Sequence, residues 1–138
     1  MYILGIDFGT KIIGLSIADE KIKIATPWKN IKFPKNNYLY VICQIKKLIS
    51  QYEIKFIVLG YPLNMNGSIS KSSQLVEQFK KLLEDNLKIN VILWDERLST
   101  KHSIELLKEN ALLKSSQIKK IKDKVAAQYI LQDYIDNN

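Results

Sequence analysis

The 138-residue sequence contains one cysteine and one histidine, and it has no long apolar run. Cys43 excludes an intramolecular disulfide; because it falls among Val41, Ile42 and Ile45 on an expected helix, we expect a small core residue rather than a nucleophile. His102 falls in the first turn of another expected helix, where exposure is more typical than catalysis. No apolar stretch approaches the roughly 20 residues that cross a bilayer, and no basic-then-apolar leader opens the sequence. We therefore expect a cytoplasmic protein that does not cross a membrane.

Arginine is equally scarce, and lysine supplies almost all of the positive charge. The formal net charge of +7 fits a nucleic-acid partner, because lysine neutralises phosphate, but a general bias toward Ile, Lys and Asn would give the same charge. Among 21 basic residues only Arg97 is an arginine, which indicates a position that needs a planar, bidentate donor. The apolar content of 46% and charged content of 25% are typical of a globular protein, and we expect residues 1–138 to form a single domain.

Hydrophobic periodicity divides the chain into strand and helix patterns. Short apolar or alternating runs, the first a hairpin that turns at Gly9, predict strands within 3–17, 22–33, 56–60 and 91–94. Pro27 indicates a bulge or an edge position in the third strand. Helical spacing predicts helices over about 39–52, 71–87, 100–112 and 116–135. This order predicts an α/β fold with a five-stranded mixed sheet, three antiparallel strands followed by two parallel ones, flanked by helices.

Acidic residues follow strands that should share one edge of this sheet. The first, fourth and fifth strands are expected to run parallel, so their carboxyl ends lie together. That edge receives Asp7, the loop that begins at Gly60, and the run Asp95-Glu96-Arg97. The sequence therefore predicts a polar site there.

A third acidic position lies on the last expected helix. Asp123 precedes Ala126 and Ala127 by one turn, and small residues let a helix approach its neighbours closely. Its flanking residues Lys122 and Lys124 indicate an ordinary solvated position, which is the favoured interpretation when this segment is taken alone.

Several converging carboxylates in a basic protein indicate hard-cation chemistry. Mg²⁺ and Mn²⁺ prefer oxygen ligands, and two such ions about 4 Å apart stabilise the attacking and leaving oxygens of phosphodiester cleavage. Lysines crowd the start of the last helix, where they would either contact phosphates or form its solvated face; they are Lys114, Lys119, Lys120, Lys122 and Lys124.

Four motifs in one order resemble the YqgF/RuvX family of Holliday junction resolvase-like nucleases. They are DFGTKIIGLSIAD at 7–19, LGYPLNMNGS at 59–68, DERLST at 95–100 and DKVAAQYILQDYID at 123–136. The resemblance covers nearly the whole chain. It implies a ribonuclease H-like fold and a cytoplasmic bacterial nuclease that processes the 5′ end of the 16S ribosomal RNA precursor, with resolution of branched DNA as the related alternative.

The resemblance also assigns roles to residues. The metal-binding and catalytic acids fall on Asp7, on Asp95 or Glu96, and on Asp123, with two Mg²⁺ or Mn²⁺ ions as the cofactor. Successive residues at a strand end point in opposite directions, so only one of the middle pair should face the metal, and Glu96 is favoured for its longer arm. The expected substrate contacts are Lys11, Arg97, Asn64, Asn66, Ser68, Lys120 and Lys124.

The chain departs from the family pattern at two positions. Ile12 stands where the family usually has arginine, and Asn66 stands where it usually has aspartate; both changes affect expected substrate contacts and neither removes a metal ligand. One other function remains open, an RNA-binding ribosome maturation factor without catalysis. Asp-Phe-Gly-Thr at a hairpin also resembles actin-like ATPases and sugar kinases, but these need two such domains around the nucleotide, and this chain has room for one. We expect a monomer or a weak homodimer, since resolving a junction requires two active sites.

Overall fold

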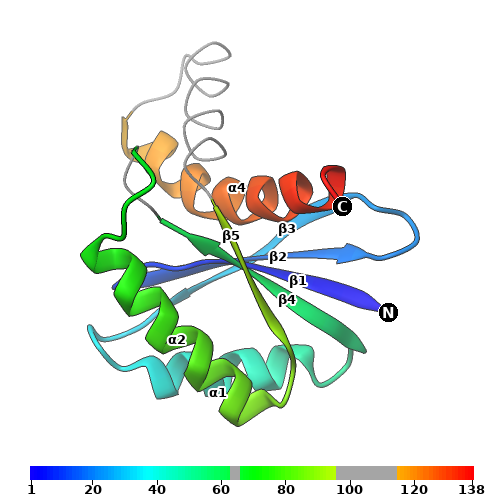
Figure 1. Ribbon diagram of the computed structural model, residues 1–138, viewed down its shortest axis with the longest axis horizontal. Coiled ribbons are helices and arrows are strands. Elements are labelled where there is room, and N and C mark those ends of the chain that lie inside the picture. Colours follow the sequence, from blue (N-terminus) through cyan, green and yellow to red (C-terminus); the bar gives the residue numbers. More distant parts are fainter. Residues whose placement is uncertain (63–65, 96–114) are drawn as a thin grey trace.

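A five-stranded mixed sheet forms the centre of the protein (Figure 1). The computed structural model describes residues 1–62, 66–95 and 115–138, with side chains in the last segment described from residue 125 onward. The strands are β1 (Tyr2–Asp7), β2 (Ile12–Asp19), β3 (Ala25–Lys32), β4 (Ile54–Tyr61) and β5 (Val91–Asp95). Their order in the sheet is β3-β2-β1-β4-β5, with β1, β2 and β3 antiparallel and β4 and β5 parallel to β1. The predicted arrangement of three antiparallel and two parallel strands is confirmed.

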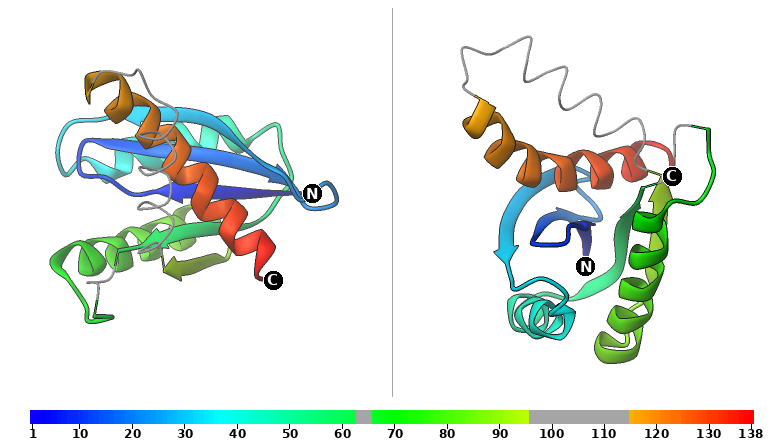
Figure 2. Two further views of the ribbon diagram at one scale, coloured as in Figure 1. Left: turned by 90° about the horizontal axis from the view of Figure 1, so that it is seen from above. Right: turned by 90° about the vertical axis from the view of Figure 1, so that its left-hand side faces the viewer.

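Helices cover both faces of the sheet (Figures 1 and 2). α1 (Tyr38–Ile49) and α2 (Lys71–Leu87) lie on one face, and α4 (Ser115–Asp136) crosses the other. The larger core fills the α1/α2 face, with Leu4, Ile6 and Phe79 among its fully buried members. A smaller apolar cluster lies under α4; it comprises Ile3, Ala18, Ala25, Val58, Ile130 and Leu131. Within the described segments, no helix combines the length and apolarity that crossing a membrane requires.

α2 agrees with the sequence in extent, whereas α1 ends at Ile49, three residues before the predicted end, and some positions expected in the core are exposed. α2 has the predicted bounds and begins with a capping box between Ser70 and Ser73. α1 begins one residue before the predicted Leu39, whose side chain is exposed. Cys43 is exposed, so its predicted core position is wrong: the buried residues of α1 occupy an arc of about 100°, and Cys43 lies outside that arc. The helix expected over 100–112, with His102, lies outside the described residues.

The third strand is an edge strand with an irregular register, as Pro27 predicted. It begins at Ala25, three residues later than expected, after a turn in which Lys23 has a φ of 62°. Leu15 pairs with Lys29 whereas Ser16 pairs with Pro27, so Trp28 is an extra residue in β3. The side chains on β3 therefore change faces at Trp28.

α4 is held close to the sheet by a buried hydrogen bond. The Ser16 hydroxyl donates to the Ala127 carbonyl oxygen at 2.7 Å, and Ser16 and Ala127 are both fully buried. Opposite them, a Cβ atom on Gly5 would overlap the Ser16 hydroxyl and lie 2.8 Å from the Leu131 Cβ. The close approach predicted for the alanine pair is thus present, and it requires glycine on β1.

Removing the Ser16 hydroxyl tests this attachment. Ser16→Ala should lower the free energy of unfolding by about 1–2 kcal/mol, because a buried carbonyl loses a donor. Thr26→Val is the matched control, since the Thr26 hydroxyl donates to Ile17 at an exposed position and its loss should change stability by less than about 0.5 kcal/mol. Equal urea midpoints for the two variants would contradict the assignment.

Adding a methyl group to Gly5 tests the close approach itself. Gly5→Ala should destabilise the protein by about 1–3 kcal/mol, because the helix or the strand must shift. The double variant Gly5→Ala/Ser16→Ala should stay destabilised, since the Leu131 contact remains. Wild-type stability of Gly5→Ala in urea unfolding would show that α4 has room to move.

Candidate functional site

Asp7 ends β1 and belongs to the face of the sheet that α4 covers. Alternation along β1 places Leu4 and Ile6 in the larger core and Gly5 beneath Leu131 of α4. Asp7 follows two residues after Gly5 and so shares its face. The side chain is half-buried at the carboxyl edge of the parallel strands, as predicted.

Glycines lie beside Asp7 on both neighbouring strands. Asp7 pairs with Gly14 of β2. On the other side, the register from Ile6 and Leu59, continued by one residue, brings Gly60 of β4 level with Asp7. Because neither glycine carries a side chain, no neighbouring strand residue crowds the carboxylate laterally.

Asn30 and Trp94 form the outer ends of this row. Asn30 pairs with Gly14, and Trp94 pairs with Gly60. The Asn30 Oδ1 atom is buried and accepts no hydrogen bond in the described structure. The Trp94 Nε1 donates to Asp133 Oδ2 of α4 at 2.7 Å. Trp94 thus attaches α4 to β5, whereas the Asn30 Oδ1 atom has no hydrogen-bond partner among the described residues.

The backbone of α4 approaches the level of Asp7 one turn before Ala127. Ala127 lies over Gly5 and Ser16. Position 123 precedes Ala127 by four residues, which is about 6 Å along a helix, and Asp7 lies two residues beyond Gly5, which is about 7 Å along a strand. The C-terminal residues of α4 lie toward the start of β1, so both steps lead to the carboxyl edge (Figure 2). The Asp123 side chain lies outside the described part.

Asp95 belongs to the opposite face of the sheet. Leu93 packs against the larger core and Trp94 against the cluster under α4, so alternation assigns Asp95 to the α1/α2 face. There Asp95 pairs with Tyr61, the last residue of β4. Glu96 and Arg97 lie outside the described residues.

Tyr61 connects this edge to α2. Its hydroxyl donates to Glu77 Oε1 at 2.8 Å, and the hydrogen bond to that carboxylate raises the pKa of Tyr61. The phenol therefore stays neutral at physiological pH and acts as a hydrogen-bond donor from β4 to α2.

The loop after β4 is built by short polar contacts. The hydroxyls of Ser70 and Ser73 both donate to the Pro62 carbonyl, at 2.9 and 2.7 Å, which fixes the loop to the start of α2. Asn66 Oδ1 accepts from the backbone N–H and the hydroxyl of Ser68. Asn66 and Ser68, both predicted substrate contacts, therefore also shape an exposed turn; Asn64 lies outside the described residues.

The turn after Asp7 is tightly constrained. A Cβ atom on Gly9 would overlap the carbonyl oxygen of Ile12, so this position requires glycine. The backbone N–H of Phe33 donates to the Lys11 carbonyl at 3.0 Å, which ties the turn to the end of β3. Lys11 itself is exposed beside the edge that carries Asp7.

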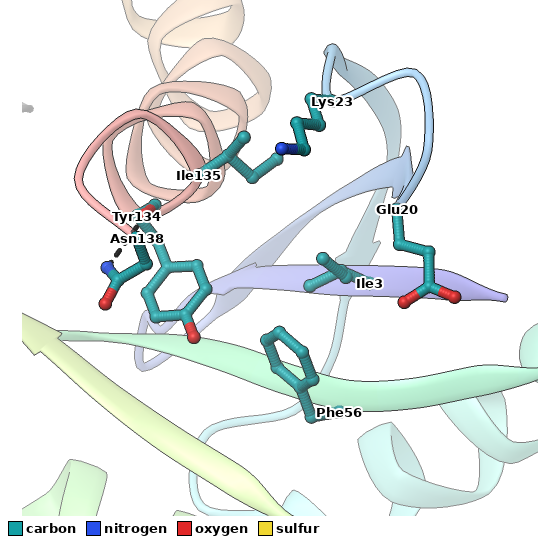
Figure 3. Close-up of a pocket in the computed structure, with 7 residues that line it drawn as sticks. All are labelled: Ile3, Glu20, Lys23, Phe56, Tyr134, Ile135 and Asn138. Atoms are coloured by element: carbon teal, nitrogen blue, oxygen red, sulfur yellow. Dashed lines mark hydrogen bonds between the residues drawn. The ribbon is translucent and has the colours of Figure 1, made fainter.

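A shallow pocket lies at the other end of the α4 face (Figure 3). Its wall includes Ile3, Phe56, Tyr134 and Ile135, near the starts of β1 and β4 and the end of α4. Glu20 also lines the pocket, and its carboxylate accepts a hydrogen bond from Lys55 at 3.0 Å, which lowers the pKa of that carboxyl. This pocket is at the amino edge of the parallel strands, away from Asp7, and is not the predicted site.

The described side chains alone contain no group of three potential metal ligands; those of Glu96 and Asp123 lie outside that set. Lys120 and Lys124 belong to α4, but their side chains, like that of Asp123, are not among those that the structure describes. What the described structure brings together at one edge is therefore Asp7, its two glycine neighbours, Lys11 and the anchored loop after β4.

Sequence reasoning did not identify Asn30. In a regular strand Asn30 would share a face with Trp28, and only the extra residue in β3 moves it to the face of Asp7. Pro27 signalled the irregularity, but it did not specify which residue would be the extra one.

Comparisons with known proteins agree with this architecture. The family model described as "RuvX: Holliday junction resolvase" matches residues 1–137. A protein of Aster yellows witches'-broom phytoplasma named "Putative pre-16S rRNA nuclease" is 44% identical over 134 residues, covering 96% of this chain and 87% of that protein. A protein of the same name from Geobacillus sp. is 37% identical, with 99% of each chain covered.

A solved structure has the same fold. That of T. thermophilus RuvC in complex with a Holliday junction substrate matches with a TM-score of 0.61 and 10% identity, covering 99% of this chain and 94% of that one. The fold is therefore that of the ribonuclease H-like resolvases, as predicted. Together with the family match over nearly the whole sequence, this shows that the chain belongs to the RuvX family of Holliday junction resolvase-like nucleases.

Proposed function

We propose that this protein is a divalent-metal-dependent nuclease that processes the 5′ end of pre-16S ribosomal RNA. The observation that carries the proposal is the position of Asp7, at the carboxyl edge of β1 with a glycine on each neighbouring strand. Relatives that are 37–44% identical over nearly their whole length carry the name of a pre-16S rRNA nuclease, which supports the substrate.

The chemistry of the proposed donor set fits a hard cation. Carboxylate oxygens are the ligands that Mg²⁺ and Mn²⁺ prefer, and the glycines beside Asp7 leave room next to its carboxylate. When bound, two such ions would supply charge stabilisation to the attacking and leaving oxygens of the phosphodiester. Asp7, Glu96 and Asp123 would hold them.

Asp95 is the weaker candidate for the middle ligand. It belongs to the face opposite Asp7, which supports our preference for Glu96. Asp7 lies about 7 Å beyond Gly5 along β1, and position 123 lies about 6 Å before Ala127 along α4. Because these two distances are similar and lead to the same edge, they support Asp123 as the third ligand.

The substrate contacts follow from the same edge. Lys11 and Arg97 would bind phosphate oxygens. The remaining proposed contacts belong to the loop after β4 and to α4; they are Asn64, Asn66, Ser68, Lys120 and Lys124.

Two alternatives differ in substrate or in chemistry. The description of the family favours branched DNA as the substrate. Resolving a junction would need two copies of the chain acting on opposed strands, so a measurement of the mass in solution tests this alternative. A maturation factor that binds RNA without cutting it would show salt-dependent binding that Asp7→Asn leaves unchanged.

Asp7→Asn tests the metal site. The change keeps the shape of the side chain but removes its charge, so cleavage of precursor ribosomal RNA with Mg²⁺ or Mn²⁺ should fall at least about 100-fold while the unfolding midpoint stays near that of the wild type. Isothermal titration with Mn²⁺ should show weaker binding, and a four-way DNA junction assayed in parallel distinguishes the substrates.

Asp19→Asn is the matched control for that experiment. Asp19 ends β2 at the opposite edge of the sheet, where its carboxylate accepts from the Lys21 backbone N–H, so cleavage should be unchanged. Equal cleavage by Asp7→Asn and the wild type would show that the metal-site assignment is wrong.

A further inference from the structure

One continuous segment of the chain carries a charge equal to the net charge of the whole chain. Residues 21–52 contain seven lysines and no aspartate or glutamate. This segment therefore carries a formal charge of +7, as large as the net charge of the whole chain, and the remaining residues balance one another. The segment forms β3, the turn after it and α1, so a compositional bias spread evenly along the chain does not account for the charge.

Two of these lysines lie at the same edge of the sheet as Asp7. Lys32 is the last residue of β3, which runs in the same direction as β1, and Lys35 lies in the turn that follows. Both side chains are exposed. Neither forms an ion pair with any residue of the described segments.

Lys32 faces the same side of the sheet as Asp7. It pairs with Ile12 of β2, two residues before the Gly14 that pairs with Asp7, so alternation puts Lys32 and Asp7 on one face. β1 and β3 lie about 10 Å apart across the sheet, and along the strand direction Lys32 lies about 7 Å beyond the level of Asp7. A few nucleotides of backbone would span that separation.

Lys11 extends this surface toward Asp7. Its carbonyl accepts from the Phe33 N–H at 3.0 Å, directly after Lys32, so the turn after Asp7 and the end of β3 are joined. We call the exposed side chains of Lys11, Lys32 and Lys35 the basic rim. Residues 8–18 and 21–37, which form both sides of the rim, contain no acidic side chain that would neutralise it.

We propose that the basic rim binds the sugar-phosphate backbone of the substrate and carries the strand from Asp7 toward the β3 edge. The proposal rests on the function proposed above and adds Lys32 and Lys35 as strand-binding residues. Ammonium groups on a rigid strand end and a tight turn bind phosphates without reading sequence, so the rim supplies affinity and direction, while the acids determine where cleavage occurs.

Metal-free binding tests the rim apart from catalysis. The probes are a fluorescently labelled RNA hairpin with a single-stranded 5′ extension and a DNA of the same sequence, titrated in EDTA at several salt concentrations. Lys32→Ala/Lys35→Ala should weaken binding several-fold and reduce the slope of log affinity against log salt by about one per lysine lost. A rim that contacts only backbone should lose affinity for both probes.

A second double variant controls for total charge. Lys21→Ala/Lys46→Ala removes two exposed lysines of the same segment, but Lys21 lies in the turn at the opposite edge and Lys46 in the last turn of α1. It should bind like the wild type. Equal weakening by both doubles would overturn the proposal in favour of a diffuse charge effect, as would wild-type binding by the rim variant.

Cleavage separates failure of the rim from failure of the nuclease assignment. If Asp7→Asn abolishes cleavage and the rim variant binds normally, the proposed function stands and the rim does not. If the rim variant binds weakly while Asp7→Asn still cuts, the rim stands and the metal-site assignment fails.

Discussion

The hydrogen bond between the Ser16 hydroxyl and the Ala127 carbonyl determines where α4 lies on the sheet, and the proposed site depends on that placement. α4 supplies one of the three proposed carboxylates, but among the described residues no backbone hydrogen bond ties it to β1. Its position depends on side chains: Ser16 at the centre, Trp94 with Asp133 toward β5, and Gln128 and Gln132 on the backbone of Ala25. Gly5 allows the approach, because any larger residue there would separate the two layers.

A need for space also explains the glycines on either side of Asp7. In the proposed site Asp7 shares a cation with two other acids and needs space beside its carboxylate, and large side chains at positions 14 and 60 would fill that space from either side. Both positions are buried, where glycine ordinarily costs stability because it packs nothing and loses more backbone entropy than other residues. Their presence within two strands is therefore better explained by the proposed site than by the fold.

Much of the fold could be predicted from sequence because it depends on local patterns. The strand directions followed from the hairpin and from the helices between the later strands, and α2 followed from its apolar spacing. Cys43 was misplaced because its apolar neighbours suggested a core position, whereas its helical angle places it outside the buried arc. Asp7 could be predicted since it ends a strand on a shared edge. Asn30 and Lys32 could not, because their face depends on which residue of β3 is extra, and that is decided by packing against β2.

The irregularity at Trp28 also bears on the departure at Ile12. The family resemblance implied that an apolar residue there would remove a basic contact from the turn after Asp7. Ile12 pairs with Lys32 across the β2–β3 ladder, and directly opposed side chains lie about 5 Å apart. Were β3 regular from Ala25 onward, its residues would alternate without interruption and Lys32 would face α1. The extra residue instead turns Lys32 toward the face of Asp7. Lys32 of β3 thus supplies, on the face of Asp7, a positive charge that β2 lacks at Ile12. The basic rim therefore depends on how β2 pairs with β3 and not on either strand alone.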